Sequence, residues 1–321
     1  MDNVSMTVRA ADDVYRTYAT VQEPATLFKK AISYINSARA ISREQENLLN
    51  QAVEDMMMHA IFGSNTIEHA GLNLDITMHL CRKILRGEDQ GEITEQEKLA
   101  ELYRMDPPLK EQSLQHVLRG YQEVVQHFKA FQHLIRHFAV EKEYMTEELI
   151  KETHAILCKG VSVIHRQGPE TPSQNYAGIY RTVVVGAGNS NFVVPQHVPS
   201  QMAKLCANLK QEIIKAEVAK SIDPFSLASK YSLEFVQIHP FLDGNGRMCR
   251  LILNAILFRF TGIFVVIGES ESDREEYMSI KRRSSETMEG HGEYATFVLN
   301  KGMRSFRKIK QKLHGKRAQH C

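Results

Sequence analysis

Residues 239–250 read HPFLDGNGRMCR and lie between two amphipathic patterns, one ending near Ile238 and the other starting near Gly246. Gly244, Asn245 and Gly246 tolerate backbone angles that most residues avoid, and they let a ligand approach the main chain. At the start of a helix their amide N–H groups converge on one point, and the helix dipole favours negative charge there. The stretch therefore predicts a loop between two helices that binds an anion such as a diphosphate.

Charged side chains beside this loop fit the same chemistry. Arg247 and Arg250 are three positions apart, so one helix face presents both guanidinium groups to phosphate oxygens. Asp243 is a hard oxygen ligand that suits Mg²⁺ or Mn²⁺, and His239 is a base that titrates near neutral pH. Each residue alone is more often part of a turn, a solvated helix face or a structural hydrogen bond. Their combination in one short stretch predicts a site that joins a base, a metal ligand and two guanidinium groups to a loop that binds a diphosphate.

The rest of the chain shows mostly helical periodicity. We expect helices over residues 42–62, 74–86, 93–104, 111–138, 146–158, 199–219, 225–238 and 246–262. The one convincing strand signal consists of residues 181–185 and 191–194 on either side of the sequence GAGNS, a pattern typical of a β-hairpin. The predicted fold class is all-α with a single β-hairpin.

Composition excludes several classes of protein. With 43% hydrophobic residues, 24% charged residues and a net charge of +2, the 321-residue chain has no strong field toward nucleic acid or membranes. The five cysteines are scattered and form no CxxC pair, which argues against a disulfide framework or a structural zinc site. The start lacks a signal-peptide pattern, and Arg259 and Gly262 interrupt the longest apolar stretch, residues 251–267. We therefore expect a cytoplasmic protein without a membrane segment.

Two further features have structural explanations that we favour. His127, His133 and His137 are interleaved with phenylalanine and leucine, so we interpret them as part of a packed helix and not as metal ligands. Residues 301–321 contain eight Lys or Arg and no acid. A solvated amphipathic helix end explains this tail best, and nuclear import or nucleic-acid contact is the alternative.

Residues 239–250 resemble the signature of the Fic (Fido) family, HPFx(D/E)GNGRxxR, and match it at every specified position. Members of this family have a compact helical fold and mostly transfer AMP from ATP to Ser, Thr or Tyr of target proteins. The resemblance implies that His239 deprotonates the target hydroxyl and that Asp243 holds Mg²⁺. It also implies which groups bind the phosphates of ATP: for the α- and β-phosphates the amides of Gly244, Asn245 and Gly246 with Arg247, and for the γ-phosphate Arg250.

The resemblance also implies a flap and an adenine contact. Family members carry a flap after a G-x-Y-R segment, seen here as residues 178–181, and the predicted hairpin at 181–194 follows it. Such a flap can pair with an extended segment of a target protein through main-chain hydrogen bonds; a purely structural hairpin is the alternative. The segment from Arg274 to Tyr277 resembles the one that carries an adenine-contacting aromatic. Asn254 either helps the nucleotide site or packs in the core.

An upstream segment, Ser64-Asn-Thr-Ile-Glu68, resembles the inhibitory motif of the family, (S/T)xxxE(G/N). In regulated relatives this glutamate forms a salt bridge with the second arginine of the signature. The resemblance therefore implies that Glu68 pairs with Arg250 and blocks productive binding of the γ-phosphate. His69 stands where Gly or Asn is usual, which leaves Gly71 as an alternative helix stop. The alternative for Glu68 is a solvated helix face.

The resemblance suggests three segments: an N-terminal extension (1–40), a Fic domain with its inhibitory helix (41–300) and a basic C-terminal tail (301–321). The expected function is a protein adenylyltransferase that uses ATP and is autoinhibited by Glu68; a homo-oligomer remains open. One alternative is an enzyme that removes AMP from a modified target, with Glu68 orienting water. The others are an idle Fic binding module and a family branch that moves phosphate or phosphocholine.

Overall fold

The computed structural model describes residues 6–10, 14–16, 24–39, 43–88, 94–165, 167–186, 192–286 and 290–315. In chain order the helices and strands are β1 (Thr7–Val8), α1 (Pro24–Arg39), α2 (Arg43–Ile67), α3 (Leu74–Leu85), α4 (Glu95–Met105), α5 (Leu114–Leu134), the π-helical η2 (Ile135–Val140), α6 (Glu147–Cys158), α7 (Val198–Ala219), β2 (Ser221–Ile222), α8 (Pro224–Ile238), α9 (Asn245–Thr261), α10 (Glu271–Glu286) and α11 (Gly292–Gly315). Short 3₁₀ turns lie at Pro107–Glu111, Ser173–Asn175 and Pro195–His197. Among these residues helices dominate, so the predicted all-α class is confirmed.

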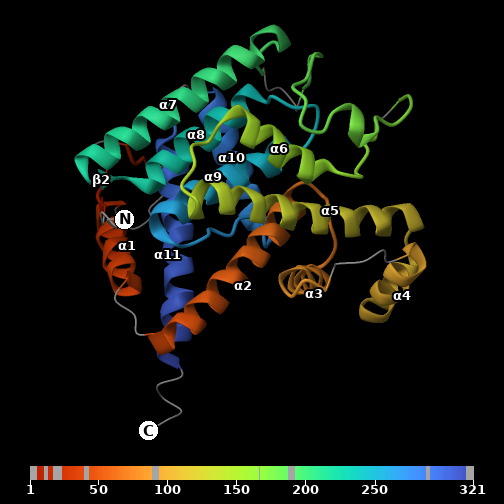
Figure 1. Cartoon of the computed structure of the whole chain (residues 1–321), viewed down its shortest axis with the longest axis horizontal. Helices are drawn as coiled ribbons and strands as arrows, with labels where there is room; N and C mark the ends of the chain where they lie inside the picture. Colours follow the sequence, from red (N-terminus) through yellow and green to blue (C-terminus); the bar gives the residue numbers. More distant parts are fainter. Residues whose placement is uncertain are drawn as a thin grey trace.

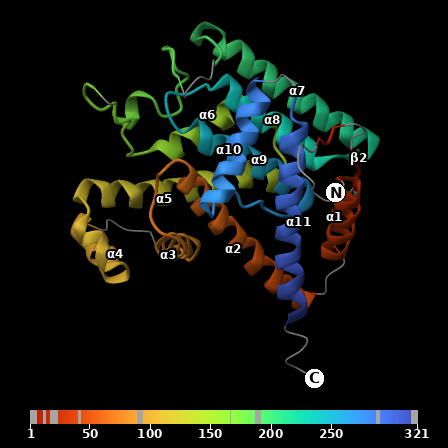
Figure 2. The ribbon, with the colours of Figure 1, turned by 180° about the vertical axis from the view of Figure 1, so that it is seen from behind.

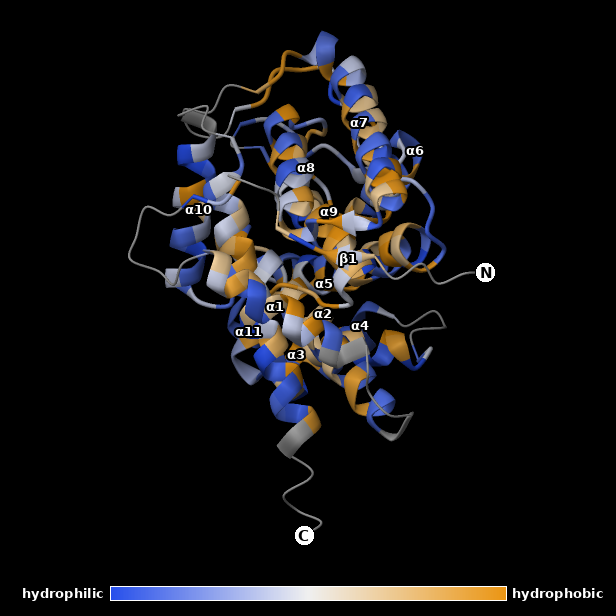
Figure 3. Ribbon diagram, turned by 90° about the vertical axis from the view of Figure 1, so that its left-hand side faces the viewer, coloured by the Kyte–Doolittle hydropathy of each residue, from blue (hydrophilic) through white to orange (hydrophobic). Residues whose placement is uncertain are grey.

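Helix α9 forms the centre of the molecule (Figures 1 and 2). It packs against α2, α5, α8 and η2, and its buried side chains include Leu251, Ile252, Leu253, Ala255, Ile256 and Leu257. A helix that is apolar on nearly every side is stable only inside a core. In the hydropathy view, hydrophobic residues gather around α9 (Figure 3). The arginines in the first turns of α9 therefore project from a buried and rigid backbone.

The two ends of the described chain join the same core. Helix α1 packs on α11 (Figure 2), where the ring of Tyr34 stacks on that of Phe306, and its side chains Leu27, Phe28 and Ile35 are nearly inaccessible. Strand β1 pairs in parallel with β2. Helix α11 runs through residue 300, and Lys301 is buried in an ion pair with Asp273. Side chains from before residue 40 and from after residue 300 therefore belong to the same hydrophobic core as the rest of the described chain. None of the described helices is long and apolar enough to cross a membrane.

The prediction of two β-strands in the hairpin is wrong for the described residues. Residues 181–186 and 192–194 form no strand, and the loop tip at 187–191 lies outside the described residues. The guanidinium of Arg181 holds the two segments instead, by donating to the carbonyl oxygens of Val183 (2.9 Å) and Val193. The β-branched residues of these segments predict two hydrogen-bonded strands. However, Val184 is 81% exposed, so the segments lack a buried face. A two-stranded ribbon without a buried face is only marginally stable.

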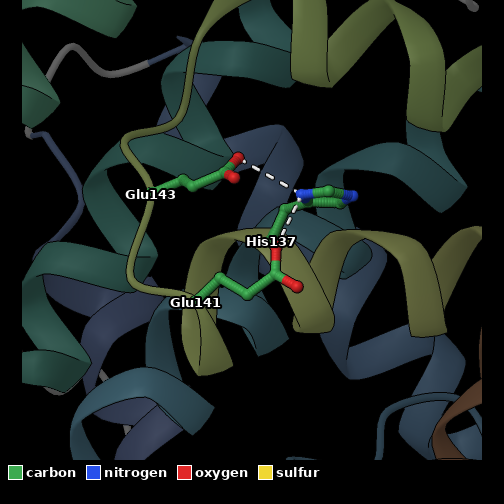
Figure 4. A group of neighbouring side chains, drawn as sticks. All are labelled: His137, Glu141 and Glu143. Carbon is green, nitrogen blue, oxygen red and sulfur yellow. Dashed lines mark ion pairs between the residues drawn. The ribbon is translucent and has the colours of Figure 1, made fainter.

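The single helix expected over residues 111–138 is divided, because α5 passes into the π-helical turn η2. At this turn His137 Nδ1 lies 3.0 Å from Glu141 and 3.2 Å from Glu143 (Figure 4). The three side chains could hold a cation by their spacing. However, Arg136 already donates to Glu141 (2.8 Å) and the group is at the surface. We therefore describe it as a network of surface ion pairs.

Candidate functional site

The signature loop, residues 239–244, joins α8 to α9. Asn245 closes this loop with its own side chain: Oδ1 accepts from the amide of Phe241 (2.9 Å) and Nδ2 donates to the carbonyl of the same residue (2.8 Å). The Phe241 ring is fully buried and anchors the loop. Gly244 has φ +75°, and a Cβ there would lie 3.2 Å from both Cys158 Sγ and His154 Nε2, so any other residue would be strained and crowded. The first amides of α9 are therefore held in place with no earlier turn to accept their hydrogen bonds.

His239 ends α8 in a left-handed conformation (φ +53°), and its amide donates to Phe235 (3.0 Å). Its Nδ1 lies 3.2 Å from the carbonyl oxygen of Val236, an arrangement that assigns the ring proton to Nδ1 and leaves the Nε2 lone pair for a substrate. The ring stacks on Phe192 with centroids 3.9 Å apart. Burial lowers the pKa of His239 to about 4, although the hydrogen bond to Val236 acts in the opposite direction. The imidazole is neutral at pH 7 and can accept a proton.

Arg181 fixes the main chain around this base. Its Nε donates to the carbonyl of His239 (2.6 Å), and its amide donates to the carbonyl of Pro240 (2.9 Å). Since the same guanidinium also holds Val183 and Val193, one side chain ties residues 181–186 and 192–194 to the signature loop.

Arg247 provides cationic donors inside the site. Its side chain is 4% exposed, and Nη2 lies 3.5 Å from the Asp243 carboxylate. Its Nε and Nη1 are buried and have no hydrogen-bond partner among the described residues. Buried guanidinium donors without acceptors are costly, so this geometry favours an anion bound beside them. The carboxylate of Asp243 is 39% exposed and can still reach a ligand.

Arg250 is engaged by the end of α2. Its Nη2 donates to Glu68 Oε1 (2.7 Å) and to the carbonyl of Ser64 (2.9 Å), and its Nε donates to the Ser64 hydroxyl (2.8 Å). A Cβ on Gly246 would overlap Glu68 Oε1, so the carboxylate lies against the amide loop itself. Burial opposes ionisation of Glu68, but Arg250, with Arg247 and Lys281 adding to it, lowers the pKa of the carboxyl group. Glu68 is therefore an anion that lies between Arg250 and the start of α9.

Helix α2 ends where the motif places its end, despite the histidine at position 69. The amide of His69 donates to Thr66 (3.1 Å) and that of Ala70 donates to Asn65 (3.0 Å). This pair of hydrogen bonds is a Schellman cap. Glu68 is its C-cap residue, and His69, the next residue, takes the left-handed conformation (φ +52°). The helix therefore does not continue to Gly71.

Two residues considered for the nucleotide site have other contacts. Tyr277 is fully buried, and the Arg250 guanidinium lies 5.7 Å from its ring centroid. Its ring supports Arg250 and offers no exposed face to adenine in this structure. Asn254 accepts from the amide of Val265 (2.7 Å) and donates to its carbonyl (3.2 Å), so it braces the segment after α9.

His154 has a part in the site that the sequence did not reveal. Its Nε2 donates to the carbonyl of Asp243 (2.9 Å), its Nδ1 accepts from the amide of Gly178 (2.9 Å), and its ring stacks on Phe241 at 3.6 Å. Burial lowers the pKa of His154 to about 4, so the ring is neutral and keeps this tautomer. His154 thereby joins Gly178, just before residues 181–186, to the signature loop. Within α6 it looks like any buried histidine, and its partner at Asp243 is distant in sequence.

Known proteins resemble this chain in sequence and in fold. The model of the Fic/DOC family matches residues 144–257. Protein adenylyltransferase fic-1 of Caenorhabditis briggsae is 35% identical over 132 residues, which are 41% of this chain and 25% of that protein. A Fido domain-containing protein of Dictyostelium discoideum is 35% identical over 105 residues, 33% of this chain and 69% of that protein. The solved structure of Fic-1 (residues 134–508) from C. elegans has a similar fold, with a TM-score of 0.64 at 18% identity over 92% of this chain and 73% of that one.

These matches differ in how far they extend. The chain spans about a quarter to a third of the length of the adenylyltransferases of C. briggsae and Nematostella vectensis that it matches. It spans more than two thirds of the Dictyostelium protein, and the family model covers α8, the whole signature loop and most of α9. This chain belongs to the Fic/DOC family.

Proposed function

We propose that this protein transfers AMP from ATP to a hydroxyl side chain of another protein and that Glu68 inhibits the transfer. The observation that carries the proposal is the buried pair of donors on Arg247, which have no acceptor among the described residues and belong to a residue in the first turn of α9. His239 stands at the other end of the same loop with a neutral ring. Relatives of this chain in Caenorhabditis briggsae, Nematostella vectensis and C. elegans are named protein adenylyltransferases.

The donor set fits a nucleotide with its metal. The α- and β-phosphates fit the amides of Gly244, Asn245 and Gly246 together with Arg247, since helix N-termini and guanidinium forks both favour phosphate oxygens. Asp243 has a partly exposed carboxylate next to this place, the hard oxygen ligand that Mg²⁺ or Mn²⁺ takes along with substrate phosphates. Bound there, the cation would neutralise charge on the phosphates.

The transfer step follows from the position of His239. Nε2 accepts the proton of the target hydroxyl, and the hydroxyl oxygen forms a bond to the α-phosphorus. The bond from the α-phosphorus to the bridging oxygen breaks, and pyrophosphate leaves. Phe192 and Arg181 hold the imidazole and its backbone, so the base does not have to be ordered during the step.

The target protein is proposed to dock on the flap segments 181–186 and 192–194. Val183, Val184 and Val194 are at least half exposed there. The segments are adjacent to the base, because Phe192 stacks on His239. An extended target segment could add its main chain to them and present its hydroxyl to Nε2.

Glu68 is proposed to inhibit transfer by occupying the position of a phosphate. Its carboxylate neutralises Arg250 and lies over Gly246. ATP can then bind only with its phosphates displaced, and the α-phosphorus is not in line with the attacking hydroxyl. Positioning supplies much of the catalysis of phosphoryl-type transfer, so such a displacement strongly reduces the rate.

Asp243→Ala is expected to remove the metal dependence of ATP binding and to slow AMP transfer, because the phosphates lose the oxygen ligand that holds their cation. Calorimetric titration with ATP, with and without Mg²⁺, measures the first effect. Asp75→Ala, which changes an acid in the first turn of α3, is the control. If the Asp243 variant and the wild type gain equally from Mg²⁺, Asp243 is not the ligand.

The pH dependence of transfer should show the lowered pKa of His239. A base with a pKa of about 4 stays deprotonated as the pH falls through 6 and is lost only as it falls through about 4. We therefore expect the acid side of the kcat/KM profile, measured over short times in the Glu68→Gly protein, to fall near pH 4. A midpoint near 6.5, the ordinary value for histidine, would show that the base is not in this buried environment.

Removal of AMP from a modified protein is a second candidate, and the position of Glu68 favours it. The carboxylate is 38% exposed and lies over the loop where the α-phosphate would bind, so it could orient a water molecule toward that phosphorus. Release of free AMP from an adenylylated protein by the wild type, and its loss in Glu68→Gly, would establish this reaction.

Intact-protein mass spectrometry tests the proposed transfer. Wild-type and Glu68→Gly proteins are incubated with ATP and Mg²⁺, alone and with acceptor proteins. The proposal predicts adducts of one AMP that are more abundant with Glu68→Gly. Phosphate-sized adducts would indicate a different transferred group, and a complete lack of adducts would favour an idle binding module.

A further inference from the structure

Arg274 holds the end of α2 from a neighbouring helix. From the first turn of α10, its Nε donates to the carbonyl oxygen of Ile67 (3.2 Å) and its Nη2 donates to His69 Nε2 (3.1 Å). Its Nη1 is engaged by Glu271 (2.9 Å), so the guanidinium is itself oriented. Glu68 is the residue between the two that Arg274 contacts. One side chain thus contacts the residues on both sides of Glu68, the backbone of Ile67 and the ring of His69.

The cap at this helix end needs support. His69 takes a left-handed conformation that is unfavourable for a residue with a Cβ and natural for glycine. Its ring supplies an acceptor that glycine would lack, and Arg274 uses that acceptor. The arginine also places a cation at the C-terminus of α2, where the helix dipole and the last carbonyl groups favour it.

Helix α10 contacts the other partner of the ion pair as well. One turn after Arg274, the ring of Tyr277 lies 5.7 Å from the guanidinium carbon of Arg250. Figure 2 shows α10 crossing the molecule beside α9 toward the end of α2, and the hydrogen bonds of Arg274 establish that contact. The same helix face therefore aligns Glu68 from one side and Arg250 from the other.

We propose that Arg274 is a positioning residue for inhibition, which holds Ile67 and His69 so that the Glu68 carboxylate stays on Arg250 and over Gly246. The proposal rests on the proposed function, since it assigns a part to Arg274 only in the inhibited state. Without Arg274, the cap at His69 loosens, Glu68 leaves its position for part of the time, and ATP binds productively during that time.

The test compares initial rates of AMP transfer in wild type, Arg274→Ala, Glu68→Gly and the double variant. We expect Arg274→Ala to increase the wild-type rate several-fold and to have no effect in the Glu68→Gly background. If Arg274→Ala raises the rate only when Glu68 is present, it acts by positioning Glu68 and not through a general structural effect. Arg283→Ala is the matched control, because Arg283 is also on α10 and pairs with Glu293 at the surface (2.6 Å). It should leave both backgrounds unchanged.

Each of the following results would overturn the proposal. If Glu68→Gly raises the rate and Arg274→Ala does not, Arg274 does not position Glu68, while the inhibitory function of Glu68 stands. If Arg274→Ala raises the rate equally in both backgrounds, it acts elsewhere. No gain from Glu68→Gly itself would remove autoinhibition and this proposal together. If Arg274→Ala fails to fold, Arg274→Lys replaces it in the test. Lysine keeps the positive charge but lacks the forked guanidinium, so we expect a smaller gain in the rate of AMP transfer. The absence of any gain in this variant would contradict the proposal.

Discussion

Replacing Glu68 by glycine is expected to raise AMP transfer by on the order of 10²-fold, the scale on which a small misplacement of reacting groups affects a rate. The substitution frees Arg250 for the γ-phosphate and removes the carboxylate from the space over Gly246. Initial rates at saturating ATP and Mg²⁺, with the same acceptor protein, measure the effect. The rate, and not the melting temperature, should respond. Arg250 keeps its two contacts with Ser64, and a partly exposed ion pair typically contributes about 1 kcal/mol or less.

The molecule offers a closely matched control for this variant. Glu217 lies in the last turn of α7, is 46% exposed and pairs with Arg259, whose side chain is 5% exposed. Glu217→Gly thus also removes a carboxylate from a buried arginine near a helix end, but away from the signature loop. It should leave transfer unchanged. An equal gain in the two variants, or no gain in Glu68→Gly at matched folding, would contradict inhibition by Glu68.

Loss of His239 is expected to have the largest effect in the other direction. His239→Ala, made in the Glu68→Gly background, should lower kcat by about 10²- to 10⁴-fold, the usual contribution of one general base. ATP affinity should change little, because the imidazole acts on the attacking hydroxyl and no phosphate group depends on it. Parallel measurements of kcat and of ATP binding by calorimetry separate the two effects.

His291→Ala provides the comparison for this loss. His291 is also partly buried, and it contacts Ser226 at the other end of α8 (2.9 Å). It should therefore show the cost of removing a histidine from this part of the fold without removing the base. Near-normal turnover in His239→Ala would exclude His239 from the proton transfer.

The parts of the structure that were predictable from sequence are those with local causes. The amphipathic periods predict α2 to α9 because burial on one face imposes the helical repeat. The signature loop is equally local, since Gly244 and Asn245 form their turn with residues close in sequence. The proximity of Glu68 to Arg250 is not local. It was expected only through the resemblance to the Fic family, and the structure places the two at 2.7 Å.

The misses have a common physical origin in long-range contacts. The valines at 183–185 suggest strands, but whether strands form depends on a buried face that these segments lack. His154 and Arg274 have local sequences typical of ordinary helices, and their partners at Asp243, Ile67 and His69 are brought to them only by tertiary packing. The position of the Tyr277 ring, which lies beside Arg250 and not at an open surface, could not be predicted from the sequence either.

The central claim is that this site transfers the adenylyl group of ATP, and the fate of a labelled phosphate tests it most directly. The Glu68→Gly protein is incubated with acceptor proteins, Mg²⁺ and ATP that is labelled at either the α- or the γ-phosphate. The account predicts that label from α-labelled ATP becomes bound to protein and that label from γ-labelled ATP appears only in released pyrophosphate. Both should be absent when His239 is also replaced by alanine. Protein-bound label from the γ-phosphate, or no bound label from either, would contradict the account.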